Sequence, residues 1–284
     1  MSLTINRIIL LGQTQLTSQL KMNSDEAKFE TQLLLQHALK VNRAWLVAHA
    51  FDEIQDNLYE AFEMLLKRRL KGEPIAYILG YREFFGLPLK VSADTLIPRP
   101  DTETLVESAL DKIPSHASNH VLDLGTGSGA IALAIAKHRP NAQVTAVDAS
   151  QAALTIAIEN ALHLNIKNAH FELSNWFSAL NNQKFDVIVS NPPYIETNDV
   201  HLKQGDLRFE PLSALASGAD GLQDIRIIIS QAPQYLNPQG WLLLEHGYNQ
   251  AEQVAALLKQ AGFSQISHAQ DLAGINRVTQ GKFS

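Results

Sequence analysis

The spacing of apolar residues along the chain changes near residue 85. Before that point they recur three and four positions apart, which is the period of one face of a helix. Ser24 is expected to cap such a helix, because Asp25 and Glu26 follow in its first turn, where the helix dipole favours acidic side chains. The predicted buried face of this helix is formed by Ala27, Thr31, Leu34, Leu35, Ala38 and Leu39.

A second helix is predicted from about Asp56, and Gly72 and Pro74 end it. Its buried side carries Leu58, Phe62, Leu65, Leu66 and Leu70. Its last turn carries a run of basic residues, Lys67, Arg68, Arg69 and Lys71. We interpret this run as a solvated last turn whose positive charges complement the helix dipole. The alternative is contact with an acidic or RNA-bearing partner.

Beyond Val91 short runs of β-branched residues and leucine alternate with helical patterns, which predicts a mostly parallel sheet covered on both faces. The predicted strands are His120–Leu124, Gln143–Val147, Ala169–Leu173, Phe185–Ser190 and Gly240–Glu245. The predicted helices are Ala130–His138, Gln151–Leu164, Asp224–Tyr235 and Gln250–Ala261. Two late runs, Gln265–Ala269 and Asn276–Gln280, are expected to complete the sheet as a closing pair.

The chain is therefore expected to contain two domains. A helical domain spans residues 1–85, and an α/β domain spans residues 101–284. Residues 86–100 are predicted to be the linker, because Ile97–Asp101 contains two prolines and is too proline-rich for the interior of a helix.

Composition narrows the class of protein. The 284 residues are 45% hydrophobic and 18% charged, which excludes a disordered chain. No apolar run approaches the ~18 residues of a membrane span, and Ile8–Leu11 is shorter than the roughly 7–15 apolar residues of a secretory signal. We expect a cytoplasmic protein that does not associate with a membrane.

A metal site and a stable nucleic-acid partner are both disfavoured. The chain has no cysteine, and its ten histidines form no His-x-His or His-Glu-x-x-His pair, so no metal is expected. The net charge is −6 and the isoelectric point is about 5.9, whereas binding to phosphates needs clustered lysine and arginine.

A glycine-rich turn, Gly125–Gly129, follows the first predicted strand and precedes a predicted helix. Glycines let the backbone turn tightly and let a ligand rest on exposed N–H groups at a helix N-terminus. The third glycine comes one residue too early for a dinucleotide fingerprint, and no Lys-Ser or Lys-Thr pair follows as in a P-loop. Asp123, just before the turn, suits a cationic group better than a pyrophosphate.

A second acid, Asp148, ends the next predicted strand 23 residues after Gly125. An acid near this position in Rossmann-like folds accepts hydrogen bonds from a ribose. S-adenosylmethionine (SAM) satisfies both acids, because it has a ribose and an amino-acid tail but no phosphates. At this point two alternatives remain open, a nicotinamide cofactor and a structural turn that binds nothing.

The sequence Asn191-Pro192-Pro193-Tyr194 follows the predicted strand Phe185–Ser190. The two prolines fix φ and remove two backbone donors, so the chain leaves the sheet rigidly. The Pro192 carbonyl and the Asn191 side-chain oxygen are neighbouring acceptors, which match the two N–H donors of an –NH₂ group. Tyr194 offers a flat face for stacking. This pattern predicts a site for a planar amine or amide nitrogen, and a purely structural turn is the alternative.

These residues resemble the class I SAM-dependent methyltransferases that modify planar nitrogens. The wider pattern resembles most closely the HemK/PrmC protein-glutamine methyltransferases, which methylate the glutamine of the Gly-Gly-Gln tripeptide in peptide chain release factors. The resemblance covers nearly the whole chain. Its further motifs are Gly72–Tyr77, Arg82–Phe84, Ile97–Glu103, Arg208–Pro211 and Leu243–Gly247.

The resemblance implies a Rossmann-like, mostly parallel seven-stranded sheet with a small helical N-terminal domain, which we expect to recognise the protein substrate. It implies a SAM site without metal and class I release factors as partners. The implied SAM contacts are Gly125, Thr126, Gly127, Ser128, Gly129, Asp148, Trp176 and Asn191. The implied glutamine contacts are Asn191, Pro192, Pro193 and Tyr194, and the first two of these are the expected catalytic residues.

Some roles stay open. Trp176 is equally suited to core packing. Asn175 stands where the family commonly has an acid that accepts a hydrogen bond from the adenine amino group, and the asparagine oxygen can still accept one without charge. Arg99 and Glu103 either pin the linker or contact ligand. Arg208, Phe209 and Glu210 either order the loop after Tyr194 or touch substrate.

Two rival functions remain. A nucleic-acid adenine amino-methyltransferase would use the same planar –NH₂ group, but the net charge of −6 and the family resemblance disfavour it. A SAM-binding regulator without catalysis is disfavoured by the intact Asn191–Tyr194 motif. For methyl transfer we expect the enzyme to supply chiefly geometry, with nitrogen, methyl carbon and sulfur in line. The proton can leave after the transfer, when the nitrogen is cationic.

Overall fold

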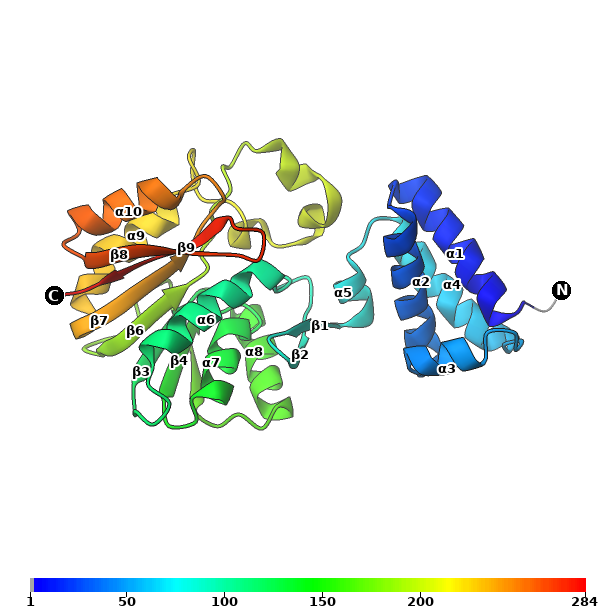
Figure 1. Cartoon of the computed structure of the whole chain (residues 1–284), viewed down its shortest axis with the longest axis horizontal. Coiled ribbons are helices and arrows are strands. Elements are labelled where there is room, and N and C mark those ends of the chain that lie inside the picture. Colours follow the sequence, from blue (N-terminus) through cyan, green and yellow to red (C-terminus); the bar gives the residue numbers. More distant parts are fainter. Residues whose placement is uncertain (1–2) are drawn as a thin grey trace. The chain divides into compact units, whose positions relative to one another are not determined.

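Helices build the first unit of the chain, which ends at Gly80. The computed structural model describes residues 3–284 and separates into this unit and a second unit, Tyr81–Ser284 (Figure 1). The helices of the first unit are α1 (Ile5–Leu20), α2 (Ser24–Leu39), α3 (Arg43–Ala48), α4 (Asp56–Leu70) and α5 (Ile75–Leu79). Their apolar faces enclose one core, which includes Ile8, Leu16, Leu34, Leu35 and Phe62.

The N-terminal cap of α2 is Asn23, so the prediction that Ser24 caps this helix was wrong. Asn23 Oδ1 accepts a hydrogen bond from the backbone N–H of Glu26 at 2.8 Å, and Ser24 is the first helical residue. Both residue types favour the cap position, and the geometry of the preceding turn decides between them.

The basic last turn of α4 is not uniformly solvated, which corrects the prediction from the sequence. Arg69 is buried, and its Nε donates to Glu30 Oε2 of α2 at 2.6 Å. Arg68 Nη2 donates to Glu73 at 2.5 Å and Lys67 lies 3.4 Å from Glu63, both at more exposed positions. The run therefore joins elements within the first unit as well as complementing the helix dipole.

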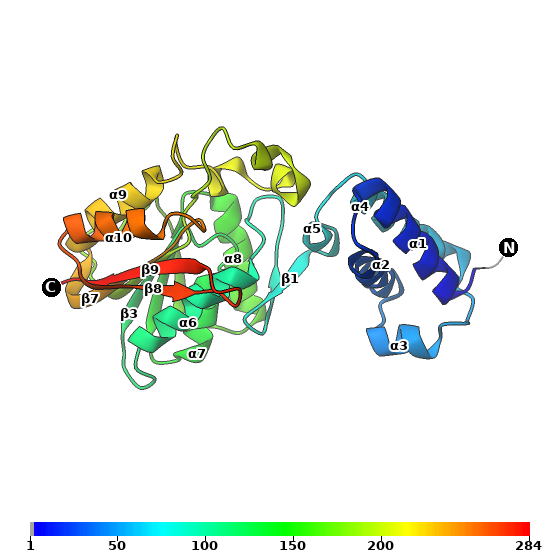
Figure 2. The same ribbon diagram turned by 45° about the horizontal axis from the view of Figure 1, so that its top comes forward.

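A seven-stranded sheet with the order β5-β4-β3-β6-β7-β9-β8 forms the centre of the second unit (Figures 1 and 2). The first five strands are parallel and β9 is antiparallel to both of its neighbours, as the predicted closing pair requires. The strands are β3 (His120–Leu124), β4 (Gln143–Asp148), β5 (Ala169–Leu173), β6 (Phe185–Ser190), β7 (Leu236–Glu245), β8 (Ser264–Gln270) and β9 (Asn276–Lys282).

Helices cover both faces of this sheet, and the predicted α/β fold is confirmed. The alternation of side chains along a strand sends Val187 and Val189 of β6 to one core and Ile188 to the other. The helices are α6 (Glu103–Lys112), α7 (Ala130–His138), α8 (Gln151–His163), α9 (Gln223–Gln231) and α10 (Ala251–Gln260). The first core contains residues of α6 and α7, and the second contains residues of α9 and α10.

Residues 81–100, most of them predicted to be a linker, fold with the second unit. A hairpin of β1 (Tyr81–Phe84) and β2 (Leu87–Lys90) buries Phe84 and Leu89 in the first of these cores. Asn160 of α8 holds β2, because its Oδ1 accepts from Lys90 N at 2.7 Å and its Nδ2 donates to Lys90 O at 3.0 Å. Packing of two apolar side chains therefore draws this segment onto the sheet domain.

Two searches of the described residues bear on function. No helix within residues 3–284 has the length and apolar character to cross a bilayer. Within the same range, no three His, Cys, Asp or Glu side chains gather in an arrangement that would hold a metal ion.

Candidate active site

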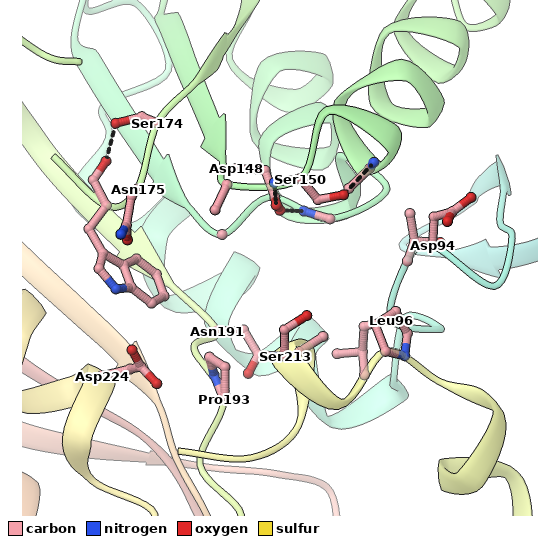
Figure 3. A pocket seen from close by; sticks show the side chains of 18 of the residues that line it. Asp94, Leu96, Asp148, Ser150, Ser174, Asn175, Asn191, Pro193, Ser213 and Asp224 are labelled. Carbon is pink, nitrogen blue, oxygen red and sulfur yellow. Dashed lines mark hydrogen bonds between the residues drawn. The ribbon is translucent and has the colours of Figure 1, made fainter. Parts of the chain in front are cut away.

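A pocket of about 550 Å³ opens where the parallel strands of the second unit end (Figure 3). Ligands of open α/β sheets bind at this edge, since the loops that follow adjacent parallel strands converge there. Most lining residues follow the ends of β3, β4, β5 and β6 or belong to the segment Ala93–Leu96. The others are Ala153 of α8, Asp224 of α9, and Pro211, Ser213 and Ala214. Figure 3 shows Asn191 and Pro193 across the pocket from Asp148 and Ser150.

The glycine-rich turn lies between β3 and α7 and contributes Gly125 and Gly127 to the pocket. Its glycines have φ of 72°, 56° and 83°, values that residues with a Cβ rarely adopt. At Gly129 a Cβ would also lie only 3.1 Å from Leu133 and 3.2 Å from Ala157, so close packing of α7 and α8 requires glycine there. Thr126, Ser128 and Gly129 are buried and do not line the pocket.

Asp148 connects the end of β4 to this turn. Its Oδ2 accepts from Gly127 N and its Oδ1 accepts from Ser150 N, both at 2.8 Å. Burial raises the pKa of the Asp148 carboxyl, and the backbone hydrogen bonds from Ser150 and Gly127 oppose that rise. The carboxylate lines the pocket, so it both fixes the turn and is accessible from the pocket.

Asp123 lies beneath the turn and does not line the pocket, in contrast to the expectation that it faces a cationic group. Its Oδ2 accepts from the Thr126 hydroxyl at 2.6 Å and from Ala132 N at 3.2 Å. Burial raises the pKa of this carboxyl to about 7. Its Oδ1 is buried without a hydrogen-bond partner among the described residues.

Trp176 follows β5 and lines the pocket while packing against the second core of the sheet unit. Its ring is 3.4 Å from where a Cβ of Gly125 would be, so it closes the pocket beside the glycine turn. Trp176 therefore packs against the core and also faces the pocket. Asn175 is exposed and its side chain also lines the pocket (Figure 3).

The motif Asn191–Tyr194 begins where β6 ends. Asn191 and Pro193 line the pocket, Pro192 is buried, and Tyr194 points its hydroxyl at Glu245. The Asn191 Nδ2 donates to Thr102 Oγ1 at 3.2 Å. This hydrogen bond uses the donor end of the amide, so the Asn191 oxygen is the end available to a ligand.

An ion pair between the partly exposed Arg99 and the buried Glu210 joins the two segments that form the remaining side of the pocket. Glu210 Oε2 accepts from Ile97 N at 3.0 Å, and its Oε1 accepts from the Arg99 guanidinium. Glu103 Oε1 accepts from Phe85 N at 2.9 Å. The structure thus places Arg99, Glu103 and Glu210 in contacts that order the chain around the pocket rather than in its lining. Arg208 lies over the ring of Phe209, 5.0 Å from its centroid.

Thr102 and Glu245 were given no site role from the sequence, although both occur in motifs of the resemblance. Thr102 is in the 3-10 helix Pro100–Thr102, and Glu245 is the last residue of β7. A signal for Glu245 was present, because an acid at the end of a leucine-rich buried strand must have partners. The sequence gives no indication that Tyr194 is such a partner.

The charge of the pocket favours a cationic ligand. The ionisable residues that line it, within the described chain, are Asp94, Asp148 and Asp224. A pocket with this lining attracts positive charge and repels phosphates. It therefore disfavours a dinucleotide and a nucleic-acid backbone.

Comparisons with known proteins identify the family. The model of the PrmC N-terminal domain matches residues 13–80, and that of the methyltransferase small domain matches residues 101–207. A release factor glutamine methyltransferase of Salmonella typhimurium is 48% identical over 92% of this chain and 94% of its own. A protein of the same name from Vibrio cholerae is 49% identical over 100% of this chain and 98% of its own.

A solved methyltransferase from Pyrococcus furiosus is 19% identical, with a TM-score of 0.52 over 76% of this chain and 96% of that chain, and it shows the fold. The second unit is a class I SAM-dependent methyltransferase fold. The family resemblance predicted from the sequence is confirmed, and the chain belongs to the release factor glutamine methyltransferases.

Proposed function

We propose that this chain transfers the methyl group of SAM to the side-chain amide nitrogen of the glutamine in the Gly-Gly-Gln motif of class I peptide chain release factors. The observation that carries the proposal is the Asn191 amide at the pocket edge, with its donor end anchored on Thr102. Near-full-length identity to release factor glutamine methyltransferases supports it. The protein is then expected to act in the cytoplasm, where release factors act on ribosomes.

The pocket fits SAM in size, backbone and charge. A volume of about 550 Å³ is within the range of small-molecule sites. Gly125 and Gly127 let a ligand approach the backbone closely, and the aspartates of the lining suit a sulfonium and an ammonium group. We propose that Gly125, Gly127, Asp148, Trp176 and Asn191 contact SAM, while Thr126, Ser128 and Gly129 shape the turn from behind.

When bound, SAM supplies an electrophilic methyl group. The residues of this chain supply the position of the nucleophile. The Asn191 oxygen and the Pro192 carbonyl accept hydrogen bonds from the two N–H groups of the substrate amide and hold its nitrogen toward the pocket, while Pro193 limits how the amide can tilt. These two hydrogen bonds also raise the electron density on the nitrogen as its positive charge develops. The new C–N bond forms as the C–S bond breaks, and the nitrogen then loses a proton to water.

The activity can be tested by incubating the full chain with radiolabelled SAM and purified release factor, then mapping peptides by mass. The expected result is a mass gain of one methylene on the glutamine of the Gly-Gly-Gln tripeptide, lost when that glutamine is replaced by glutamate. A parallel reaction with duplex DNA tests the adenine alternative. Label in DNA and none in release factor would overturn the proposal.

We also propose that the helical unit recognises the protein substrate. Its exposed surface carries apolar side chains at Val47, Phe51 and Met64, which are 67%, 84% and 62% exposed. A fragment that begins at Tyr81 retains the β1–β2 hairpin, and we expect it to bind SAM but not to methylate intact release factor. Equal activity of this fragment and the full chain would contradict the proposed role.

A further inference from the structure

A buried carboxyl group lies beside the Asn191–Tyr194 motif. Glu245 is the last residue of β7 and is 1% exposed. Ser190 of β6 pairs with Leu244 of β7 in parallel register, so Asn191 and Glu245 follow on adjacent strands at the same edge of the sheet. The sheet therefore brings together two residues that are far apart in the sequence.

Two hydroxyl side chains, those of Tyr194 and Thr102, favour the ionised form of the Glu245 carboxyl. The Tyr194 hydroxyl donates to Glu245 Oε1 at 3.3 Å. Among the described residues no hydrogen bond reaches Oε2, which is buried. The Thr102 hydroxyl favours the ionised carboxyl, as the Tyr194 hydroxyl does, so it is the group with a proton to offer to Oε2. Thr102 in turn accepts from Asn191 Nδ2 at 3.2 Å. A proton donated by Thr102 to Oε2 completes a chain of polar groups from Glu245 through Thr102 to Asn191.

The chemistry of these groups fixes the direction of each hydrogen bond. An ionised carboxylate only accepts, so both hydroxyls must donate to it. A hydroxyl has one proton, so Thr102, having donated to Glu245, can only accept from Asn191. The Asn191 amide must then turn its nitrogen toward Thr102 and its oxygen toward the pocket. Without that constraint the two ends of the amide are nearly equal in size and can exchange.

We propose that Glu245 is a positioning residue that acts through Thr102 and Tyr194 to hold the Asn191 amide with its oxygen toward the substrate. The inference rests on the proposed function, because it assigns Glu245 a part in presenting the acceptor for the glutamine N–H. A reversed Asn191 amide would place two N–H donors against the two donors of the substrate amide. Productive binding would then be lost even with the fold and the cofactor turn intact.

The first test is Glu245→Gln, which keeps the size of the side chain but adds a donor. The glutamine –NH₂ can donate to Thr102, which frees the Thr102 proton for Asn191 and favours the reversed amide. We expect turnover at saturating SAM and release factor to fall by about tenfold or more, while SAM affinity changes by less than about threefold. The expected change is therefore in kcat and not in the dissociation constant for SAM.

A matched control is Asp186→Asn. Asp186 lies near the opposite end of β6, where its carboxylate accepts from His120 N and from Asn237 Nδ2, both at 2.8 Å. Asp186→Asn therefore removes the charge of a carboxylate that accepts two hydrogen bonds in the same sheet, at a position that does not line the pocket. We expect its turnover to match the wild type, so a general effect of weakening the sheet is separated from an effect on Asn191.

A second pair of variants tests the middle of the polar chain without altering the buried carboxyl. Thr102→Val keeps the shape of the side chain and removes the hydroxyl, and it should lower turnover as Glu245→Gln does. Thr102→Ser restores a hydroxyl and should recover most of the loss. This pair decides the matter if Glu245→Gln fails to fold.

The orientation of Asn191 can also be read without activity, from the NMR signal of its side-chain –NH₂, which is assigned by its disappearance in Asn191→Ala. We expect Glu245→Gln and Thr102→Val to shift this signal and Asp186→Asn to leave it unchanged. A wild-type chain that does not methylate release factor would overturn the proposed function, and the NMR signal would still decide the positioning. Unchanged turnover in an active enzyme, or an unmoved signal, in Glu245→Gln or Thr102→Val overturns the inference.

Discussion

Two sides of one pocket are held in place by different kinds of hydrogen bond. On the glycine side, formed by Gly125, Gly127 and Asp148, the bonds involve the backbone. The N–H groups of Gly125 and Thr126 both donate to Val147 O at 2.9 Å, and Asp148 accepts from Gly127 N. The partners come from neighbouring strands, and each contact follows directly from the parallel pairing of β3 with β4.

On the amide side, formed by Asn191–Tyr194, each bond involves at least one side chain from a distant part of the sequence. Thr102 orients Asn191, Glu245 orients Tyr194, and Gln250 Nε2 donates to Tyr194 O at 3.1 Å. Backbone pairing alone sets the path of this segment but leaves its amide free to rotate. A change in a side chain that touches no ligand can therefore alter the chemistry here.

This difference separates two properties that a methyltransferase must combine. The glycine side should determine affinity for SAM, because its groups face the ligand in every step. The amide side should determine turnover, because a nitrogen must be held in line only when the methyl group moves. Substitutions on the two sides should thus affect different kinetic constants.

The largest effect is expected from Asn191→Ala, which removes the oriented acceptor from the amide side. The substrate amide would be held by one acceptor and could rotate, and the charge-assisted hydrogen bond to the developing cation would be lost. We expect turnover to fall by a hundredfold or more, about 2.7 kcal/mol. SAM affinity should change by less than roughly tenfold, about 1.4 kcal/mol.

Single-turnover methylation at saturating SAM and release factor, paired with calorimetry of SAM binding, measures both quantities for Asn191→Ala. A variant that binds SAM poorly yet transfers methyl normally at saturation would assign Asn191 to the cofactor. The separation of the two sides would then fail.

On the glycine side, Asp148→Ala should have the reverse pattern. It removes the acceptor expected to bind the ribose and also leaves Gly127 N without its partner. We expect SAM binding to weaken by roughly 1.5–3 kcal/mol, the range for a hydrogen bond to a charged group. Turnover at saturating SAM should stay near the wild-type value. Asp186→Ala is the control, and unchanged affinity in Asp148→Ala on calorimetry would refute the ribose assignment.

The amide side should also respond to pH in a way that the glycine side does not. Burial raises the pKa of Glu245 to about 7, with Thr102, Tyr194 and Arg277 favouring ionisation and Asp101 opposing it. A protonated Glu245 donates as well as accepts, so it no longer forces Thr102 to accept from Asn191. We expect turnover to fall below pH 7 by up to about tenfold per unit, the limit for one proton.

Stability should show the opposite trend for the same group. The folded state binds the Glu245 proton more tightly than the unfolded chain does, so this group favours folding at low pH and loses that contribution as pH rises through about 7. Both quantities can be measured between about pH 5.5 and 8.5. As the pH rises through this range, the turnover of the wild type should increase while its thermal stability decreases. In Glu245→Gln the pH dependence of turnover and that of thermal stability should both become weaker. If neither pH dependence changed, Glu245 would not be their source. Burial also raises the pKa of Asp123 to about 7, so a pH dependence that remains in Glu245→Gln is attributed to Asp123.

Much of the sheet was predictable from the sequence because its central strands, such as β3 and β6, are buried on both sides. The predicted bounds of His120–Leu124, Ala169–Leu173 and Phe185–Ser190 agree with β3, β5 and β6. Such strands are short continuous apolar runs with polar residues on either side, and few other structural elements have that sequence pattern. In contrast, α6 was missed, because its buried residues Leu105, Val106 and Ala109 directly follow a proline-rich segment. The hairpin β1–β2 was missed because each strand has only four residues.

The site divides in the same way. Gly125, Gly127, Asp148 and Asn191 could be found because each lies in a local motif whose chemistry can be read from a few adjacent residues. Thr102 and Glu245 could not be assigned, since their contacts depend on the register of β6 against β7 and on the position of a 3-10 helix. Local sequence therefore locates the groups that line the pocket, whereas tertiary packing determines the groups that hold them in place.

The smallest effect is expected at Asn175, where the glycine side meets solvent. Its side chain lines the pocket but is exposed, and the family commonly has an acid at this position. In Asn175→Asp a neutral acceptor becomes an ionised one, and a hydrogen bond to a charged group is stronger by about 1 kcal/mol. Solvent screens the new charge at an exposed position. We therefore expect SAM to bind more tightly by less than tenfold, about 1.4 kcal/mol, with turnover unchanged.

Calorimetry at low and high salt measures the change in SAM affinity, and Asn175→Ala is the reference that removes the acceptor. If Asn175→Asp changed affinity by more than tenfold at both salt concentrations, the carboxylate would be shielded from solvent in the complex. The pocket would then have to close over this edge when SAM binds.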